Sequence, residues 1–301
     1  MLIFRTDQFA LPLPAGHRFP AEKYGMLGQA VAAMAPDRLA EAPAATPAEL
    51  VLAHHPDYVG RMLDGSISPA IMREIGLPWS AALVERSRRS VGATLAAARS
   101  ALHYGCGINL AGGTHHAAHA KGGGFCVFND VAVSIRVLQQ EGLIRRAAVI
   151  DLDVHQGNGT AELFAGDSSV FTLSLHGEKN FPFRRVASTL DVDLPDDTGD
   201  HAYLAALANA LDTLQQRFQP DMVFYLAGAD PYSGDRLGRL QLSMQGLAQR
   251  DEQVFALCEQ RQWPLVVTMA GGYAVPIDDT VAIHCQTVRA LLARHHLKGA
   301  F

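Results

Sequence analysis

The chain has 301 residues, of which 49% are hydrophobic and 18% charged. This length and balance fit a single α/β domain spanning residues 1–301 better than a membrane or disordered chain. The net charge of −5 gives no general attraction to nucleic acid, and no Lys/Arg stripe overrules it, so we expect no direct nucleic-acid contact.

No segment resembles a secretory signal or a membrane span. The opening MLIFRTDQF places a charge after a very short apolar stretch, and no apolar run is long enough to cross a bilayer. The four cysteines are widely scattered and form no CxxC pair, which is typical of reduced thiols in or near a core. We therefore expect a cytoplasmic protein without membrane contact, whose oligomeric state the sequence leaves open.

The first eighty residues are rich in Ala and Pro and lack a regular pattern. We expect them to form loops and short helices around the entrance side of the fold. His54 and His55 precede a proline and are expected in a surface turn. The basic run Arg86, Arg88 and Arg89 is expected on a solvated helix face.

Beyond this region, short apolar runs alternate with helical patterns, which predicts a central, mostly parallel β-sheet flanked by helices. Asp200 and Ser243 stand at N-cap positions ahead of two of the helical patterns. The strands are predicted at 106–110, 147–152, 170–175, 222–226 and 265–269, and apolar helical stripes at 131–138, 204–218 and 281–292.

Ionisable or metal-ligating groups follow each of the five predicted strands. Because ligand sites in open parallel sheets form at the carboxyl ends of the strands, these groups are expected to converge. For His176 we leave open whether it supports the site or only the fold. In chain order the groups are His115 and His116, then Asp151, Asp153 and His155, then His176, then Asp230, then Tyr273.

The segment AVIDLDVHQGNGT holds the strongest metal-binding pattern. Asp151, Asp153 and His155 alternate along the chain and therefore share one face. Carboxylate and imidazole groups suit a divalent transition ion, and the lack of nearby cysteine argues against a structural zinc finger. A third ligand is still required, and Asp230 is the best candidate. Three protein ligands would leave a coordination position for water, as in catalytic sites.

Five blocks of the sequence resemble, in their order, the histone deacetylase family: GGTHH, GGGFCVFND, DLDVHQGNGT, LAGADPYSGDRLG and AGGY. The resemblance spans most of the chain, and its most specific part is DLDVHQGNGT behind a His-His pair. Within the family the chain looks closest to class IV. The details that favour this class are His17-Arg18-Phe19, Gln156, and GDRLG followed by Gln249-Arg250-Asp251-Glu252.

The resemblance implies an arginase/deacetylase-like fold and a zinc-dependent amidohydrolase that removes acetyl or longer acyl groups. Asp153, His155 and Asp230 would bind Zn²⁺, with Fe²⁺ as the alternative ion. His116 would be the principal general base and acid, and Tyr273 would stabilise the oxyanion.

Further roles are implied for the neighbours of these residues. Asp151 would orient His115 beside His116, whereas Asn158 stands behind His116 and gives it less charge support. The acyl slot would be lined by Gly124, Phe125, Phe181 and Leu237. A structural K⁺ or Na⁺ would be held by Asp151, Asp153, His155, Ser174 and Leu175.

The expected partner is an acyl-lysine protein or peptide, or an acylated small amine such as an acetylpolyamine. Two readings from other classes compete with this one. An arginase-like ureohydrolase would bind two manganese ions, against which Gln156 and Asn158 argue. A binding module would recognise acyl-lysine without turnover, against which the intact ligand set and Tyr273 argue.

Overall fold

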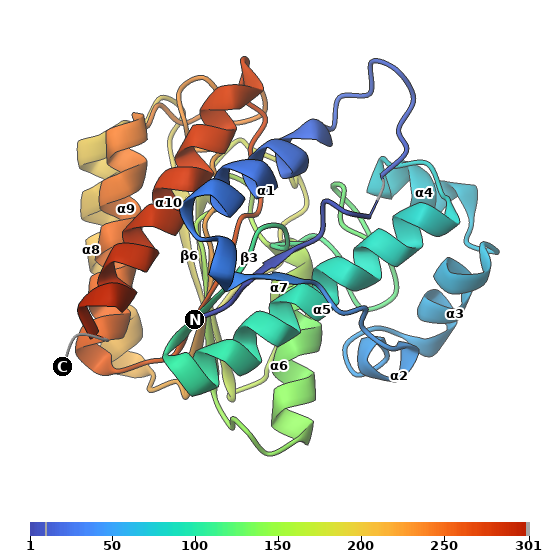
Figure 1. The fold of residues 1–301 in the computed structure, drawn as a ribbon, viewed down its shortest axis with the longest axis horizontal. Helices are drawn as coiled ribbons and strands as arrows, with labels where there is room; N and C mark the ends of the chain where they lie inside the picture. The colour runs from blue at the N-terminus through green and yellow to red at the C-terminus, as the bar shows by residue number, and fades with distance from the viewer. Residues whose placement is uncertain (10, 299–301) are drawn as a thin grey trace.

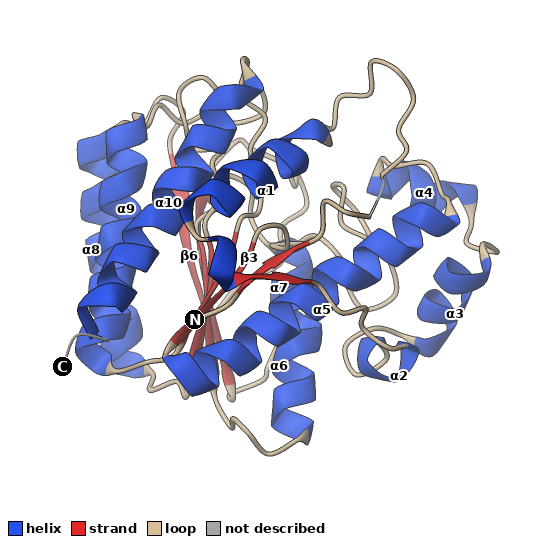
Figure 2. Cartoon of the chain, in the orientation of Figure 1, coloured by secondary structure: helices blue, strands red, loops and turns tan. Residues whose placement is uncertain are grey.

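The structure is a computed structural model that describes residues 1–9 and 11–298, with side chains described as far as residue 295. Its centre is an eight-stranded sheet with the strand order β2-β1-β3-β8-β7-β4-β5-β6, in which all neighbours are parallel (Figure 2). The strands are β1 (Ile3–Arg5), β2 (Leu39–Glu41), β3 (Cys106–Asn109), β4 (Ala147–Asp151), β5 (Val170–Gly177), β6 (Leu190–Leu194), β7 (Met222–Leu226) and β8 (Leu265–Thr268).

Helices cover both faces of the sheet, as Figure 1 shows. One face carries α1 (Glu22–Met34), α8 (Asp200–Arg217), α9 (Met244–Arg261) and α10 (Ile277–Lys298). The other carries α5 (Ala81–Tyr104), α6 (Asp130–Gln140) and α7 (Asn158–Leu163). The short helices α2 (Pro47–Leu50), α3 (Pro56–Asp64) and α4 (Pro69–Ile75) extend this second layer, and a 3₁₀ turn, η1, spans Pro36–Arg38.

The strand sequences explain why the sheet has two apolar faces. In β4, Ala148 and Ile150 belong to one core, whereas Ala147 and Val149 belong to the other. Successive side chains of a strand point to opposite faces, so a strand buried on both sides is apolar throughout. The predicted α/β fold with a central parallel sheet is therefore confirmed, and the five predicted strands match β3, β4, β5, β7 and β8.

The prediction for the first eighty residues is wrong in part. This region does contain short helices, but it also supplies two strands of the sheet, and α1 packs against α10. The strands β1 and β2 are three residues long, which is too short for an apolar alternation to be read from the sequence.

His54 is not in a surface turn, because its side chain is fully buried. Its Nδ1 donates to the carbonyl of Ala118 at 2.9 Å, and its Nε2 accepts from the backbone N–H of Asn129 at 2.8 Å. The imidazole thus fixes the loop that precedes α6. Of this pair, only His55 lies at the start of a helix, where its side chain caps α3.

The basic run in α5 is not a solvated face either. Arg86 is buried and donates to the carbonyls of Thr6 and Phe9. Arg88 and Arg89 donate to backbone carbonyls of the segment that follows β2. Guanidinium groups provide several donors each, and here they satisfy carbonyls of irregular chain that no helix or strand pairs.

The expected helix starts are confirmed at one of two positions. The Ser243 hydroxyl accepts from the N–H of Gly246 and caps α9. The N-cap of α8 is Gly199 rather than Asp200. The Asp200 carboxylate instead accepts from the N–H and hydroxyl of Ser243, so it joins the starts of two neighbouring helices.

The cysteine prediction is confirmed, since all four cysteines are buried and none is part of a disulfide bond among the described residues. Among the described residues, no helix has both the length and the apolar character that a bilayer crossing requires.

Candidate metal centre

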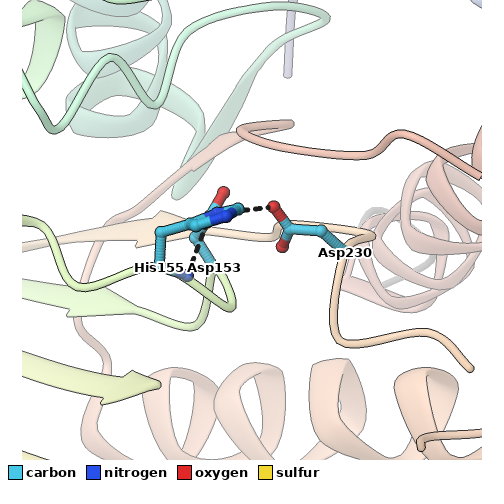
Figure 3. Close-up of side chains that lie close together, drawn as sticks. All are labelled: Asp153, His155 and Asp230. Atoms are coloured by element: carbon cyan, nitrogen blue, oxygen red, sulfur yellow. Dashed lines mark hydrogen bonds and ion pairs between the residues drawn. The ribbon is translucent and has the colours of Figure 1, made fainter. Parts of the chain in front are cut away.

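Two neighbouring strands bring together three potential metal ligands at the carboxyl edge of the sheet. Asp153 and His155 follow β4 directly, and Asp230 follows β7, which pairs with β4. One ligand atom from each residue lies within 4.8 Å of the other two. Figure 3 shows the imidazole of His155 facing the carboxylate of Asp230, with Asp153 beside it. The sequence-predicted ligands therefore converge.

Backbone groups hold the two carboxylates in place. The N–H of Gly271 donates to Asp153 Oδ2 at 2.7 Å, and the N–H of Val154 donates to Asp230 Oδ1 at 2.9 Å. A side chain at Gly271 would not fit, because its Cβ would lie 1.9 Å from Asp230 Oδ2. The glycine is required for the close approach of the 271–273 turn to both acids.

One carboxylate oxygen of this cluster has no hydrogen bond. Asp230 Oδ2 is buried without a donor, and His155 Nδ1 lies 3.3 Å from it and 2.9 Å from Asp153 Oδ1. Burial and the adjacent Asp153 carboxylate raise the pKa of Asp230 to about 7. Buried negative charge of this kind is costly unless a cation neutralises it. The donor set, two carboxylates and an imidazole, fits a divalent transition ion such as zinc.

The two histidines next to this cluster have different partners. His115 Nδ1 lies 2.7 Å from Asp151 Oδ2, whereas His116 Nδ1 lies 2.7 Å from Asn158 Oδ1. Burial lowers the pKa of His115, but Asp151 and Asp153 overcome this and raise it to about 9. Burial and the charge of His115 lower the pKa of His116 well below its usual value. As the sequence predicted, the partner of His115 is a charged carboxylate, whereas the partner of His116 is a neutral amide.

Tyr273 is held by its backbone from the loop that follows β7. Asp235 Oδ2 accepts from the N–H of Tyr273 at 2.6 Å, and Arg236 Nε donates to the carbonyl of Tyr273 at 3.2 Å. Sequence reasoning did not single out Asp235 or Arg236, although both lie in the quoted LAGADPYSGDRLG block. Backbone contacts of this kind leave no periodic signal in a sequence, so only the block itself pointed to them.

A cavity of about 600 Å³ leads to these groups. The four residues predicted to form the acyl slot, Gly124, Phe125, Phe181 and Leu237, all line it, as do His115, His116, Asp153, His155 and Tyr273. The ring of Phe181 lies 4.9 Å from that of His116. Gly124 has a φ of +51°, and a Cβ there would lie 2.4 Å from His116 Cδ2, so the glycine allows the cavity wall to approach the imidazole.

The residues expected around a monovalent cation lie close to the cluster. Asp151 and Ser174 are paired in register between β4 and β5, and Leu175 follows. The Ser174 hydroxyl lies 2.8 Å from His176 Nδ1. His176 is fully buried, and its Nε2 lies 3.0 Å from Asp193 of β6. Its contacts thus run along the sheet rather than to the three ligands, and the cation itself stays a prediction.

Two positions bear on a second transition metal. The Gln156 amide donates to the carbonyl of Val186 and to Asp191 Oδ1, away from the ligand cluster. The Asn158 amide oxygen is engaged with His116. In the described part of the chain, one group of three potential ligands is present, which fits a single divalent ion better than a pair.

Comparison with known proteins gives consistent matches over nearly the whole chain. The family model described as "Histone deacetylase domain" matches residues 17–289. An uncharacterized protein of Picosynechococcus sp. is 42% identical, with 96% of this chain and 97% of that protein covered. Histone deacetylase 2 of Arabidopsis thaliana is 39% identical over 62% of this chain, and the match spans 49% of that protein, about half its length.

Solved structures share the architecture. An HDAC homologue from Aquifex aeolicus is similar with a TM-score of 0.81 and 26% identity, with 95% of this chain and 82% of that chain covered. The same values hold for the crystal structure of an HDAC homologue complexed with SAHA.

Proposed function

The chain belongs to the histone deacetylase family, and on that premise we propose that it is a zinc-dependent hydrolase that removes acyl groups from amines. The observation that carries this proposal is the convergence of Asp153, His155 and Asp230 beside His116 and Tyr273 at a cavity of about 600 Å³. A bound zinc ion would act as Lewis acid on the acyl carbonyl and lower the pKa of a bound water to about 7.

His116 is suited to move the protons of the reaction. Because Asn158 Oδ1 accepts a hydrogen bond, Nδ1 of the neutral imidazole carries the proton and Nε2 keeps its lone pair. Nε2 would accept a proton from the attacking water and return it to the leaving amine. His115, whose Nδ1 is held by the Asp151 carboxylate, would supply positive charge beside it.

Tyr273 is suited to stabilise the oxyanion. Burial raises the pKa of its phenol well above the usual value, so the hydroxyl keeps its proton and can donate a hydrogen bond. Its backbone is fixed at both the N–H and the carbonyl, which holds the donor in position before the reaction begins. Donors of this kind stabilise charge that develops in the transition state.

The amine carrier is an acyl-lysine side chain or a related small amine. Phe125 and Phe181 provide apolar walls for an acyl-amine chain, and the cavity has room for groups longer than acetyl. The class IV details of the sequence favour long-chain acyl groups. A K⁺ or Na⁺ at Asp151 and Ser174 would have a structural and electrostatic role.

The experiment that tests the proposal is a turnover panel with zinc-loaded protein, in which both the acyl length and the amine carrier vary. We expect hydrolysis of at least one acyl-lysine substrate. Urea release from guanidino substrates by a protein with two bound manganese ions would favour a ureohydrolase. Tight hydroxamate binding without any turnover would favour a binding module.

A further inference from the structure

The entrance of the cavity is rich in positive charge, although the chain as a whole is negative. Five basic side chains line the cavity, and Glu74 is the one acidic residue among the described lining residues apart from the ligand Asp153. The net charge of the chain is −5, so this excess is a local property of the entrance. Lys23 is buried, and its Nζ donates to the carbonyl of Gly272. The other four are exposed, namely Arg18, Lys179, Arg236 and Arg239.

Two of the four exposed cations share one neighbouring carboxylate. Arg239 and Lys179 both form ion pairs with Asp196, and Glu74 is paired with Lys121. Arg18 and Arg236 have no carboxylate partner within ion-pair distance among the described residues. These two guanidinium groups are therefore exposed cations of the entrance that no described carboxylate pairs, and the buried Lys23 adds a further cation to the lining.

Contacts within the protein connect both arginines to the cavity wall that carries Tyr273. Arg236 Nη2 donates to the carbonyl of Arg18 at 3.0 Å, and its Nε donates to the carbonyl of Tyr273. The Arg18 guanidinium lies over the ring of Phe125, 5.1 Å from its centroid. The Phe125 ring lies 6.0 Å from that of Tyr273. Both cations are thus held on the same wall of the cavity as Tyr273.

We propose that the entrance selects acyl-amines that carry a carboxylate at the end of the carrier remote from the acylated nitrogen, an inference that rests on the proposed function. Arg236 uses two of its five donors on backbone carbonyls, and the Arg18 guanidinium lies over the face of the Phe125 ring, so both have donors left for a carboxylate. A carrier with a second positive charge, such as a polyamine, would be repelled by the same two groups. The substrate class is therefore acyl-lysine with a free carboxylate or in an acidic peptide.

The test measures binding with three hydroxamates of equal length whose far end carries a carboxylate, a neutral amide or an ammonium group. Dissociation constants are measured by calorimetry on zinc-loaded wild-type protein, and turnover of a neutral acyl-lysine peptide is followed in parallel. We expect the carboxylate to bind tightest and the ammonium weakest, with about a tenfold span at low salt. The span should narrow in about 0.5 M NaCl, because the entrance is open to solvent.

Variants assign the preference to the two arginines. In Arg18→Gln the ratio of dissociation constants between the amide and the carboxylate ligand should fall about threefold, whereas Arg18→Lys should keep most of it. Arg236→Gln should also lower this ratio. The matched control is Arg145→Gln, which removes an exposed charge just before β4, at the opposite edge of the sheet. It should leave the ratio as in the wild type.

The outcomes separate the two proposals. Suppose that the neutral peptide is hydrolysed, but the dissociation constants of the three hydroxamates agree within about twofold or the ammonium ligand binds tightest. The inference about the entrance is then wrong, and the proposed function stands. If the charge order holds but no acyl-amine is hydrolysed, the proposed function fails while the selectivity of the entrance holds. If none of the three hydroxamates binds, both are rejected.

Discussion

His115 and His116 are neighbours in the chain, but a carboxylate stands behind the first and an amide behind the second. Their ring centroids lie 4.1 Å apart, so a proton on one disfavours a proton on the other. Because His115 has the carboxylate, it holds the charge, and His116 remains free to accept a proton. Different roles for two identical side chains thus follow from one difference between their partners.

For the reacting side chains, we expect His116→Ala and Tyr273→Phe to keep the fold and bound zinc but to lower kcat by about 10² to 10⁴. Neither side chain belongs to the three-ligand cluster. The measurement is kcat on an acyl-lysine substrate, with zinc content and circular dichroism recorded on the same samples. Wild-type turnover in either variant would remove that residue from the mechanism.

For the ligand set, we expect Asp230→Ala to lose the metal, because the two remaining ligands bind zinc more weakly than three ligands do. Asp230 is the one ligand that comes from a second strand. Zinc per chain after dialysis against a weak chelator measures the loss. The control is Asp57→Asn, an exposed carboxylate at the start of α3, which should retain wild-type zinc. Equal zinc in both variants would contradict the ligand assignment.

Among the elements, the loop after β7 both supplies a ligand and positions Tyr273. Asp235 accepts from the N–H groups of Leu237 and Gly238 with one oxygen and from that of Tyr273 with the other. The amide of an asparagine has one accepting oxygen and one donating NH₂ group, so it cannot accept hydrogen bonds at both positions. We therefore expect Asp235→Asn to lower kcat by about tenfold or more with a smaller change in KM, because Tyr273 is displaced but the cavity remains. An unchanged kcat would show that this contact does not position the tyrosine.

His54 joins the N-terminal helices to the loop before α6, and burial lowers its pKa to about 4. The unfolded chain binds this proton with a pKa near 6.5, so stability from His54 is complete above that pH and is lost as the pH falls towards 4. Between pH 7 and pH 5 we expect about 2 kcal/mol of unfolding free energy to be lost through this group.

The measurement is urea unfolding at pH 7 and pH 5 in the presence of a chelator, for wild type and His54→Gln. Other buried histidines titrate in both proteins, so the difference between the two pH-dependent losses isolates His54. The variant should be less stable at pH 7 and lose less on acidification. An equal loss in the two proteins would contradict the role of His54.

On the scale of the whole molecule, the sequence predicted the centre of the fold better than its edges. Central strands such as β4 and β7 are apolar on both faces, and their ends carry the ligands, so both the strands and the site could be predicted. The edge strands β2 and β6 are partly exposed, and β2 is only three residues long, so neither gave a recognisable pattern. Whether a strand lies at the edge is determined by the order of strands in the assembled sheet, so the sequence of the strand itself does not reveal it.

Polar residues that act through backbone groups could not be predicted. Arg86, His54 and Asp235 each bind main-chain atoms of segments far away in the sequence or of irregular loops. Their local patterns are those of exposed residues, and only the folded chain reveals the carbonyl and N–H groups that they satisfy. Buried polar residues of this kind are where single-sequence reasoning fails.

The most direct test of the metal-dependent mechanism is a zinc titration of the stripped protein, followed by turnover of an acyl-lysine substrate. We expect no turnover without metal. As zinc is added, the rate of turnover should rise linearly and stop rising at one zinc per chain, because the described residues offer one three-ligand cluster. Full turnover in the stripped protein, in the presence of a strong chelator, would contradict the mechanism.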